Sequence, residues 1–326
     1  PILTTIRKDK RNIPAVVQLT KQGFVFALNR DTGEPIYPVE ERPVPTDGVP
    51  GESLSPTQPY PTVLPPLVPQ TIGPEDAWGV SFYDQAKCRE AIEGMRSGPI
   101  YTPPSLEGTV MYPQMGGGVN WGGGAIARDR GWLITNVARI PYFLQLLKAD
   151  EQDKKAINAP GAGRPGGPPG AIKDTPYAAR QGPLLSPLGA PCTAPPWHTL
   201  LAMDLATGEV QWEIPLGSIE QLAPVPLPVT LGAPGAGGAI VTAGGVVFVA
   251  GTPDEKIRAV DIRNGRVLWT AKLPTAAMAT PMTYEHDGFQ YLVVAAGAHQ
   301  FLYPQKPGDW IVAFKLPPDE AAAIAP

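Results

Sequence analysis

Short apolar runs alternate with polar turns along the chain, and three of these runs lead into the same pattern. The apolar runs lie at 15–19 with 24–28, at 199–203, and at 246–250 with 257–260. Each leads into Ala-x-Asp/Asn-x-x-Thr/Asn-Gly-x-x-x-Trp/Tyr, which begins at Ala27, Ala202 and Ala259. Apolar runs bounded by such turn residues are typical of β-strands. The pattern therefore predicts a β-hairpin that recurs along the chain.

Each position of the repeat has a physical role in the predicted hairpin. The side-chain oxygen of Asn29, Asp204 or Asp261 can cap the turn, and the glycine that follows takes the positive-φ position. The aromatic residue on the returning strand is expected to pack between neighbouring sheets. Because the three polar residues recur with the repeat, we interpret them as turn caps and not as acid–base catalysts.

The spacing of the repeats indicates how the hairpins assemble. Ala202 and Ala259 are 57 residues apart, and Ala313, in a fourth apolar run at 311–316, follows 54 residues later. This spacing fits blades of about four strands with loops. Radial repetition of blades leaves few free sheet edges. The sequence therefore predicts an all-β fold, a β-propeller of four-stranded blades.

Two segments between the first and second repeats depart from the strand pattern. Residues 38–124 read as an inserted region, which begins with a proline-rich extended loop at 38–74. Within it, helical spacing of Phe82, Ala86 and Arg89 predicts one short helix over 81–95, which ends at Gly94. Residues 149–173 form a Pro/Gly-rich stretch that predicts a flexible loop.

Composition narrows the fold classes and the possible partners. The 326 residues include 42 prolines and 36 glycines, which disfavours a helical bundle or a doubly wound α/β enzyme. An apolar content of 43 % disfavours disorder. The formal net charge of −4 argues against a nucleic-acid partner. No apolar run is long enough to span a bilayer and no signal peptide is recognisable, so we expect any export signal or membrane anchor outside this chain.

The two cysteines and three histidines carry little chemistry by spacing alone. Two cysteines permit one disulfide at most and cannot build a zinc site, and there is no Cys-x-x-Cys-His haem motif. His198, His286 and His299 make neither a triad nor a metal cluster by spacing. The sequence itself nominates no metal ligands.

Beyond the repeats, further motifs follow one another in a fixed order over nearly the whole chain. They are Lys21-Gln-Gly-Phe, Pro56-Thr-Gln-Pro, Phe82-Tyr-Asp-Gln, Tyr101-Thr-Pro-Pro-Ser, Asn120-Trp-Gly-Gly, Gly237-Gly-Ala-Ile-Val-Thr-Ala-Gly-Gly and Ala279-Thr-Pro-Met-Thr-Tyr. With these motifs and the Trp-docking repeat, the chain resembles the pyrroloquinoline quinone-dependent membrane-bound dehydrogenases, in the glucose, quinate and polyol branch. The match covers only the C-terminal portion of such a protein, so we expect about half of an eight-bladed ring, with 1–326 as a single partial domain.

The resemblance implies an activity and a setting. It implies oxidation of a sugar, polyol or cyclic alcohol by hydride transfer to pyrroloquinoline quinone, with electrons passed to ubiquinone. It also implies a periplasmic location facing the inner membrane, and an N-terminal half of the propeller on the same polypeptide or a separate chain. Calcium is implied as a cofactor, with its ligands and the catalytic aspartate in that missing half.

The resemblance also assigns roles to individual residues. Lys21 is expected to point at the quinone carbonyls, where a positive charge stabilises the charge that builds up on hydride transfer. Asn120 and Trp121 are expected at the cofactor, with Asn120 as a hydrogen-bond donor. Gly237 and Gly238 are expected near its rim. Each assignment has an alternative. Lys21 can be an ordinary solvated lysine, and Asn120 and Trp121 can form a tight turn whose tryptophan packs between blades. Gly237 and Gly238 can be glycines for purely steric reasons.

The resemblance further implies a disulfide between Cys88 and Cys192, which suits an oxidising compartment, with two unrelated buried thiols as the alternative. The resemblance also marks His198 as a departure, because relatives commonly carry glycine after the tryptophan that corresponds to Trp197.

A different class of function stays open, a non-catalytic propeller that serves as a scaffold or assembly platform. Such a protein shares the docking repeat but needs no residues for a cofactor.

Overall fold

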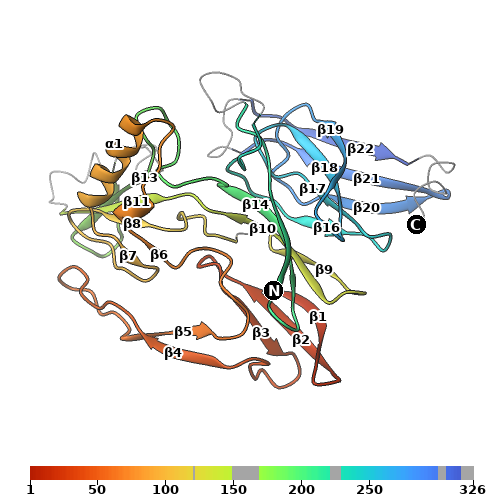
Figure 1. Ribbon diagram of the computed structural model, residues 1–326, viewed down its shortest axis with the longest axis horizontal. Coiled ribbons are helices and arrows are strands. Elements are labelled where there is room, and N and C mark those ends of the chain that lie inside the picture. The colour runs from red at the N-terminus through yellow and green to blue at the C-terminus, as the bar shows by residue number, and fades with distance from the viewer. Residues whose placement is uncertain (120–121, 149–168, 221–228, 300–305, 317–326) are drawn as a thin grey trace.

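The computed structural model describes residues 1–119, 122–148, 169–220, 229–299 and 306–316. Strands dominate these ranges, as predicted for an all-β fold, and one α-helix, α1 (Phe82–Glu93), and one 3-10 helix, η1 (Pro74–Asp76), lie among them. None of the helices in these ranges is long and apolar enough to cross a membrane. Four antiparallel sheets repeat along the chain, and Figure 1 shows them side by side.

Two of these sheets have four strands and two have three. The first sheet is β1 (Ile2–Lys8), β2 (Arg11–Leu19) and β3 (Val25–Asn29). The second is β9 (Gly124–Ala127), β10 (Trp132–Ala138), β14 (His198–Asp204) and β15 (Val210–Pro215). The third is β16 (Ala239–Val241), β17 (Val246–Val249), β18 (Lys256–Asp261) and β19 (Val267–Lys272). The fourth is β20 (Met282–His286), β21 (Phe289–Ala296) and β22 (Trp310–Lys315).

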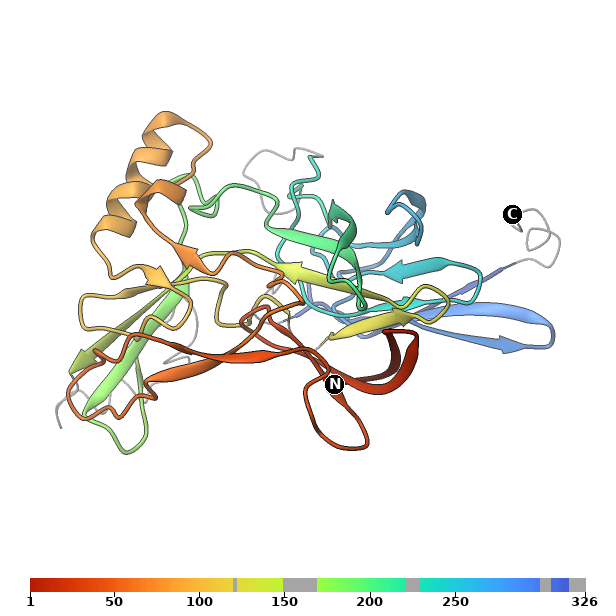
Figure 2. The same ribbon diagram turned by 60° about the horizontal axis from the view of Figure 1, so that its bottom comes forward.

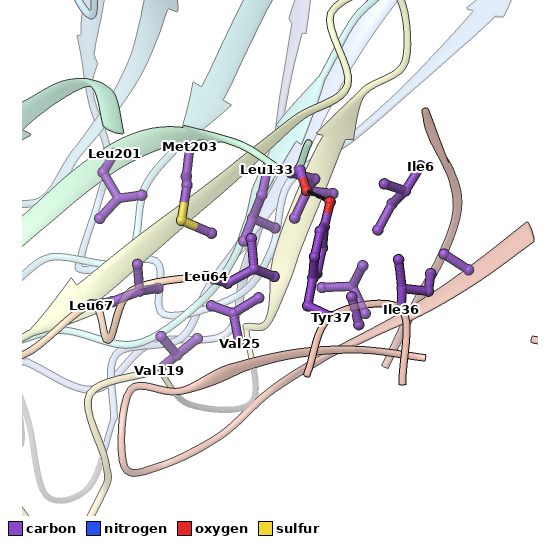
Figure 3. Packing of buried hydrophobic residues seen from close by; sticks show 14 of the residues in the cluster. Ile6, Val25, Ile36, Tyr37, Leu64, Leu67, Val119, Leu133, Leu201 and Met203 are labelled. Atoms are coloured by element: carbon purple, nitrogen blue, oxygen red, sulfur yellow. Dashed lines mark hydrogen bonds between the residues drawn. The ribbon is translucent and has the colours of Figure 1, made fainter. Parts of the chain in front are cut away.

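Hydrophobic cores lie between successive sheets, which is how propeller blades pack. Figure 3 shows the core between the first two sheets, where Tyr37 lies with Ile6 and Ile36 near Leu133 of β10. A second core joins the second and third sheets, and another joins the third and fourth. The first strands β1 and β16 both contact β9. These strands therefore line the side on which the blades converge.

The predicted turn is confirmed in all three repeats. The returning strand of the hairpin is β15 in the second repeat and β19 in the third, whereas in the first the return is a single bridge between Leu28 and Pro35. The caps form as expected: the carboxamide or carboxylate oxygen of Asn29, Asp204 and Asp261 accepts a hydrogen bond from the backbone amide two residues ahead, at 2.7–2.9 Å. The following glycines have φ values of 79°, 80° and 74° at Gly33, Gly208 and Gly265. Only a residue without a Cβ adopts this backbone conformation at little cost.

The inserted region contains more strands than its sequence suggests. The stretch 38–74, expected as an extended loop, holds β4 (Val39–Pro43), β5 (Thr57–Pro61) and β6 (Thr71–Ile72). β4 pairs with β5, and β6 pairs with β7 (Gly98–Pro99). Proline occurs in both β4 and β5, so their composition concealed a two-stranded ribbon; proline is tolerated in such edge strands.

A second excursion, between β10 and β14, was not delimited from the sequence. It contributes β11 (Tyr142–Lys148), β12 (Gly170–Ala171) and β13 (Tyr177–Pro183), which join β8 (Thr109–Met111) in a separate sheet. Figures 1 and 2 show this sheet and α1 at one end of the molecule, opposite β20–β22. Of the predicted flexible loop, residues 149–168 lie outside the described residues, and 170–171 form β12.

The predicted helix and disulfide are both present in the inserted region. Helix α1 begins after its N-cap Ser81, whose hydroxyl accepts a hydrogen bond from the Asp84 amide, and ends at Gly94. Cys88 of α1 and Cys192 form a disulfide with a Cα–Cα distance of 5.2 Å. Both cysteines are fully buried. The bridge fastens α1 to the segment that leads back into β14.

Candidate functional site

Lys21 lies in the tight turn between β2 and β3. Within this turn the Thr20 amide donates to the Phe24 carbonyl, and the Thr20 hydroxyl accepts from the Phe24 amide at 3.1 Å. The side chain of Lys21 is exposed, and its Nζ lies 3.3 Å from the carbonyl oxygen of Met115. An ammonium group carries three N–H donors, so two remain available to a ligand.

Two neighbouring segments hold the backbone of this turn in place. The amide of Gly118 donates to the Lys21 carbonyl at 2.7 Å, and the amide of Leu67 donates to the Gly23 carbonyl at 2.9 Å. The side-chain amide of Gln70 donates to the carbonyls of Gln22, at 3.2 Å, and Val68, at 3.0 Å. The backbone from which the Lys21 side chain extends is therefore held from both segments.

The glycine-rich segments nominated from the sequence meet beside this turn. A Cβ atom at Gly117 would lie 2.6 Å from the Cα of Lys21. A Cβ atom at Gly122 would collide with the carbonyl group of Gly237, and one at Gly238 with the carbonyl oxygen of Gly122. Glycine is required here because two backbones touch. Gly117 thus packs on Lys21, and Gly122 packs on Gly237–Gly238, although Lys21 and Gly238 lie more than two hundred residues apart in sequence.

Antiparallel geometry explains why these segments share one place. In a blade of antiparallel strands, the start of the first strand and the connection between the second and third lie at the same end of the sheet. Gly122 precedes β9, Gly238 precedes β16, and Lys21 lies between β2 and β3. Of the remaining nominated residues, Asn120 and Trp121 lie outside the described residues.

A small cavity opens against this glycine junction, between the second and third sheets. Its volume is about 20 Å³. We call it the His198 cavity. Its lining residues are Gln114, Gly117, Gly118, Gly122, Asn136, Ala138, His198, Gly235, Ala236 and Gly237. Because it reaches both Gly117 and Gly237, it lies directly behind the junction described above.

Two buried polar side chains, Asn136 and His198, line the cavity and were not nominated from the sequence. Asn136 of β10 is 7 % exposed, and its Nδ2 donates to the carbonyl of Gly237 at 2.7 Å. This bond fixes the backbone of the glycine that touches Gly122. The sequence signal for Asn136 was its place as a polar residue inside the apolar run of β10. A buried amide in a strand needs a specific hydrogen-bond partner, so such a residue is a candidate for a structural or functional contact.

His198 begins β14 and is 2 % exposed. Burial lowers the pKa of its imidazole to about 4; a backbone hydrogen bond with Ala233 acts in the opposite direction, and Arg258 and Asp254 exert smaller effects of opposite sign. The imidazole is therefore neutral at physiological pH. Among the described residues, its Nδ1 has no hydrogen-bond partner.

The residues present suit one of the two cofactors that the resemblance implies. An exposed ammonium next to a side-chain-free backbone junction, with a buried neutral imidazole nearby, fits a flat, electron-poor quinone laid against Lys21, because the quinone oxygens gain negative charge on reduction. The His198 cavity itself is too small to contain such a ring system. For calcium, no group of three or more His, Cys, Asp or Glu side chains suited to a metal ion occurs in the described ranges.

Several known proteins are similar in sequence to this chain over nearly its full length. Residues 1–292 match the family model described as PQQ, glucose/ethanol/alcohol dehydrogenase, β-propeller domain. The chain is 40 % identical over 327 residues to quinoprotein glucose dehydrogenase A of Acinetobacter calcoaceticus, which is 97 % of this chain and 40 % of that protein. It is 37 % identical over 319 residues to quinate/shikimate dehydrogenase (quinone) of Acinetobacter baylyi, covering 95 % and 39 %.

A third relative and two solved structures agree with these matches. The glycerol dehydrogenase large subunit of Gluconobacter oxydans is 39 % identical over 326 residues, covering 95 % of this chain and 44 % of that protein. The quinohemoprotein alcohol dehydrogenase of Comamonas testosteroni has a TM-score of 0.53 at 21 % identity, covering 96 % and 37 %. A europium-containing methanol dehydrogenase gives 0.53 at 20 %, covering 94 % and 42 %. The chain thus spans about two fifths of its curated relatives' length, and the solved structures share its fold.

Proposed function

The chain belongs to the glucose/ethanol/alcohol dehydrogenase β-propeller family, and from this premise we propose that it forms part of a pyrroloquinoline quinone-dependent dehydrogenase. The observation that carries the proposal is the packing at one end of the blades, where Gly117 and Gly118 contact Lys21 and Gly122 contacts Gly237–Gly238. In this proposal residues 1–326 are one partial propeller domain, with 38–124 inserted, and the rest of the propeller completes the ring.

The proposed substrates are polyhydroxy compounds that carry an oxidisable CH–OH group. The curated relatives are named for glucose, quinate or shikimate, and glycerol, which share that group. Two relatives are quinate dehydrogenases whose names specify a quinone, which supports a quinone as the electron acceptor. In this proposal the acceptor is ubiquinone and the site of action is periplasmic, at the inner membrane. The substrate among these compounds is decided by residues on both parts of the propeller.

Lys21 has the chief chemical role among the residues of this chain. When bound, pyrroloquinoline quinone supplies the carbonyl that accepts hydride from the alcohol carbon. The hydrogen bonds around Lys21 hold the backbone of its turn, and its ammonium contacts the Met115 carbonyl, so the positive charge would lie at the quinone and stabilise the developing negative charge. Gly122 and Gly237 pack their backbones together and form a wall without side chains. Asn120 and Trp121 are proposed to complete the contact surface.

The test uses the full-length protein that contains this chain, reconstituted with pyrroloquinoline quinone and calcium. We expect reduction of a redox dye with at least one of glucose, quinate, shikimate and glycerol. Lys21→Ala should lower kcat by about 10²- to 10³-fold, the usual effect of removing one group that stabilises developing charge. Lys21→Arg should retain more activity, because the charge is preserved.

Lys87→Ala is the matched control, because Lys87 is an exposed lysine of α1 paired with Glu90. It should leave kcat unchanged. If the reconstituted protein binds the quinone but oxidises none of the four substrates, the proposed substrate class is wrong. If it binds no quinone at all, the scaffold function is favoured instead.

A further inference from the structure

His198, one of the residues that line the His198 cavity, has a buried ring nitrogen that needs a hydrogen-bond partner. His198 is 2 % exposed, and within the described part of the chain its Nδ1 makes no hydrogen bond. Leaving a buried polar atom unsatisfied costs about 1–3 kcal/mol. A native structure therefore usually supplies such an atom with a partner from the protein or from ordered water.

A neutral imidazole carries one proton, on either of its two ring nitrogens. The backbone of Ala233 raises the pKa of His198, which favours a ring proton directed at that residue's carbonyl. Nδ1 is buried without a partner among the described residues, so we assign the proton to Nε2. Nδ1 then presents a lone pair, and it needs an O–H or N–H donor.

The size and polarity of the cavity select the donor. A volume of about 20 Å³ holds one water molecule and excludes a polyol or a ring. A buried water needs two to four polar partners. The lining residues include His198, Asn136, Gln114 and the glycines of both segments, whose side chains and backbones carry such polar groups.

We propose that the His198 cavity binds one water molecule, which donates a hydrogen bond to Nδ1 of His198 and bridges β14 to the glycine segments of the site. His198 is then a positioning residue. Its ring also packs on Gly235, where a Cβ atom would lie 2.9 Å from Cε1 of the imidazole. Through the water it steadies Gly117 and Gly118, whose amide holds the Lys21 carbonyl.

The first experiment examines the water and the tautomer in the full-length protein without any cofactor. Ring ¹⁵N chemical shifts should show a proton on Nε2 and none on Nδ1 at pH 7. A high-resolution crystal structure should show one water within hydrogen-bond distance of Nδ1. A proton on Nδ1, or a cavity without water, overturns the proposal whatever the protein catalyses. Both readouts use the wild-type chain, so they do not depend on whether a variant folds.

The second experiment rests on the proposed function and measures binding of pyrroloquinoline quinone by fluorescence titration. In His198→Asn the side-chain oxygen takes about the place of Nδ1 and can still accept from the water. His198→Phe fills a similar volume without an acceptor. We expect the Phe variant to bind the quinone about 5- to 10-fold more weakly than the Asn variant, since one hydrogen bond is lost.

His286→Asn is the matched control, because His286 is exposed on the β20–β21 hairpin, where it pairs with Asp287. It should bind like the wild type. Equal binding by the Phe and Asn variants would show that the water does not support the site and would overturn the positioning role. If the wild type itself binds no quinone, the proposed function fails, and the water site is then judged by the first experiment alone.

Discussion

Single glycines decide how closely the two backbone segments of the candidate site, at Gly122 and at Gly237–Gly238, approach each other. The sequence nominated Gly237 and Gly238 as residues near a ligand, whereas the structure shows them in backbone contact with Gly122. Their proposed role at a cofactor and this steric role are compatible, because a wall built of touching backbones presents no side chains to a flat ligand. The glycines are thus needed for the wall to form at all.

Gly122→Ala should destabilise the protein by about 1–3 kcal/mol, because its methyl group would collide with the carbonyl of Gly237. Chemical denaturation of the variant checks the value. Gly244→Ala is the control, since Gly244 is exposed and a Cβ atom there would have open space. Equal unfolding midpoints for the two variants would contradict the backbone contact.

The buried imidazole of His198 predicts a specific dependence of stability on pH. Its pKa is about 4 in the folded protein, against an ordinary value of 6.5. Between these values the unfolded chain binds a proton that the folded chain excludes, so the free energy of unfolding falls as the pH falls from 6.5 to 4. Above pH 6.5 this contribution is fully present. The loss is about 3 kcal/mol, the free-energy equivalent of the difference between the two pKa values.

Denaturation of the wild type and His198→Asn at several pH values between 4 and 7 isolates this contribution. The Asn variant should lose less stability on acidification, whereas His286→Asn should behave like the wild type because its imidazole is exposed. Asp254 and Arg258 face His198 with opposite charges and remain in both proteins. Identical pH profiles for the wild type and the Asn variant would refute the assignment.

At the scale of elements, the docking aromatics of the first two hairpins link their blades to the next. The Tyr37 hydroxyl donates to the Leu205 carbonyl at 2.6 Å, and Nε1 of Trp212 donates to the Ile262 carbonyl at 2.7 Å. Leu205 and Ile262 each follow the capping aspartate of the next blade. In these two repeats the same motif therefore produces the same kind of inter-blade contact.

The disulfide is the other link between elements, and it joins α1 to the segment before β14. Replacing both Cys88 and Cys192 by serine should lower the free energy of unfolding by about 2–5 kcal/mol, since the bridge closes a loop of 104 residues. The chain has two cysteines, so a reductant added to the denatured wild type during refolding should reproduce the effect. An unchanged midpoint in the double variant would mean that packing alone holds the helix.

At the scale of the whole molecule, the last sheet presents an open edge. Among the described strands β22 pairs on one side only, with β21, and its Trp310 and Ile311 are 55 % and 72 % exposed. The docking residue Trp269 is 39 % exposed, although its ring contacts Phe314 edge-on at 5.2 Å. An exposed apolar strand edge invites pairing with another strand.

We therefore expect residues 1–326, prepared alone, to self-associate through β22. Ile311→Lys should increase the monomer fraction in light scattering, because a charge on an edge strand opposes pairing. Val80→Lys is the control, an equally polar change at an exposed position next to α1. A wild-type chain that stays monomeric at high concentration would contradict this expectation.

The sequence determined whatever depends on neighbouring residues. The hairpin turn is a local structure, so its cap and its positive-φ glycine could be predicted at each repeat, and Ser81, helical spacing and Gly94 likewise defined α1. The β4–β5 ribbon was missed because proline concealed its strands. The repeat spacing then indicated a propeller, because hairpins of one kind pack in one way.

Tertiary structure decided whatever depends on segments far apart in the chain. Periodicity cannot show that Asn136 binds Gly237, that Gln70 holds the Lys21 turn, or that Nδ1 of His198 is buried without a partner in the described part of the chain, because each of these depends on how distant segments pack. The sequence supplied the candidate residues one segment at a time. The packing of the blades brought those segments together, since the loops at one end of antiparallel strands converge only when the sheets assemble.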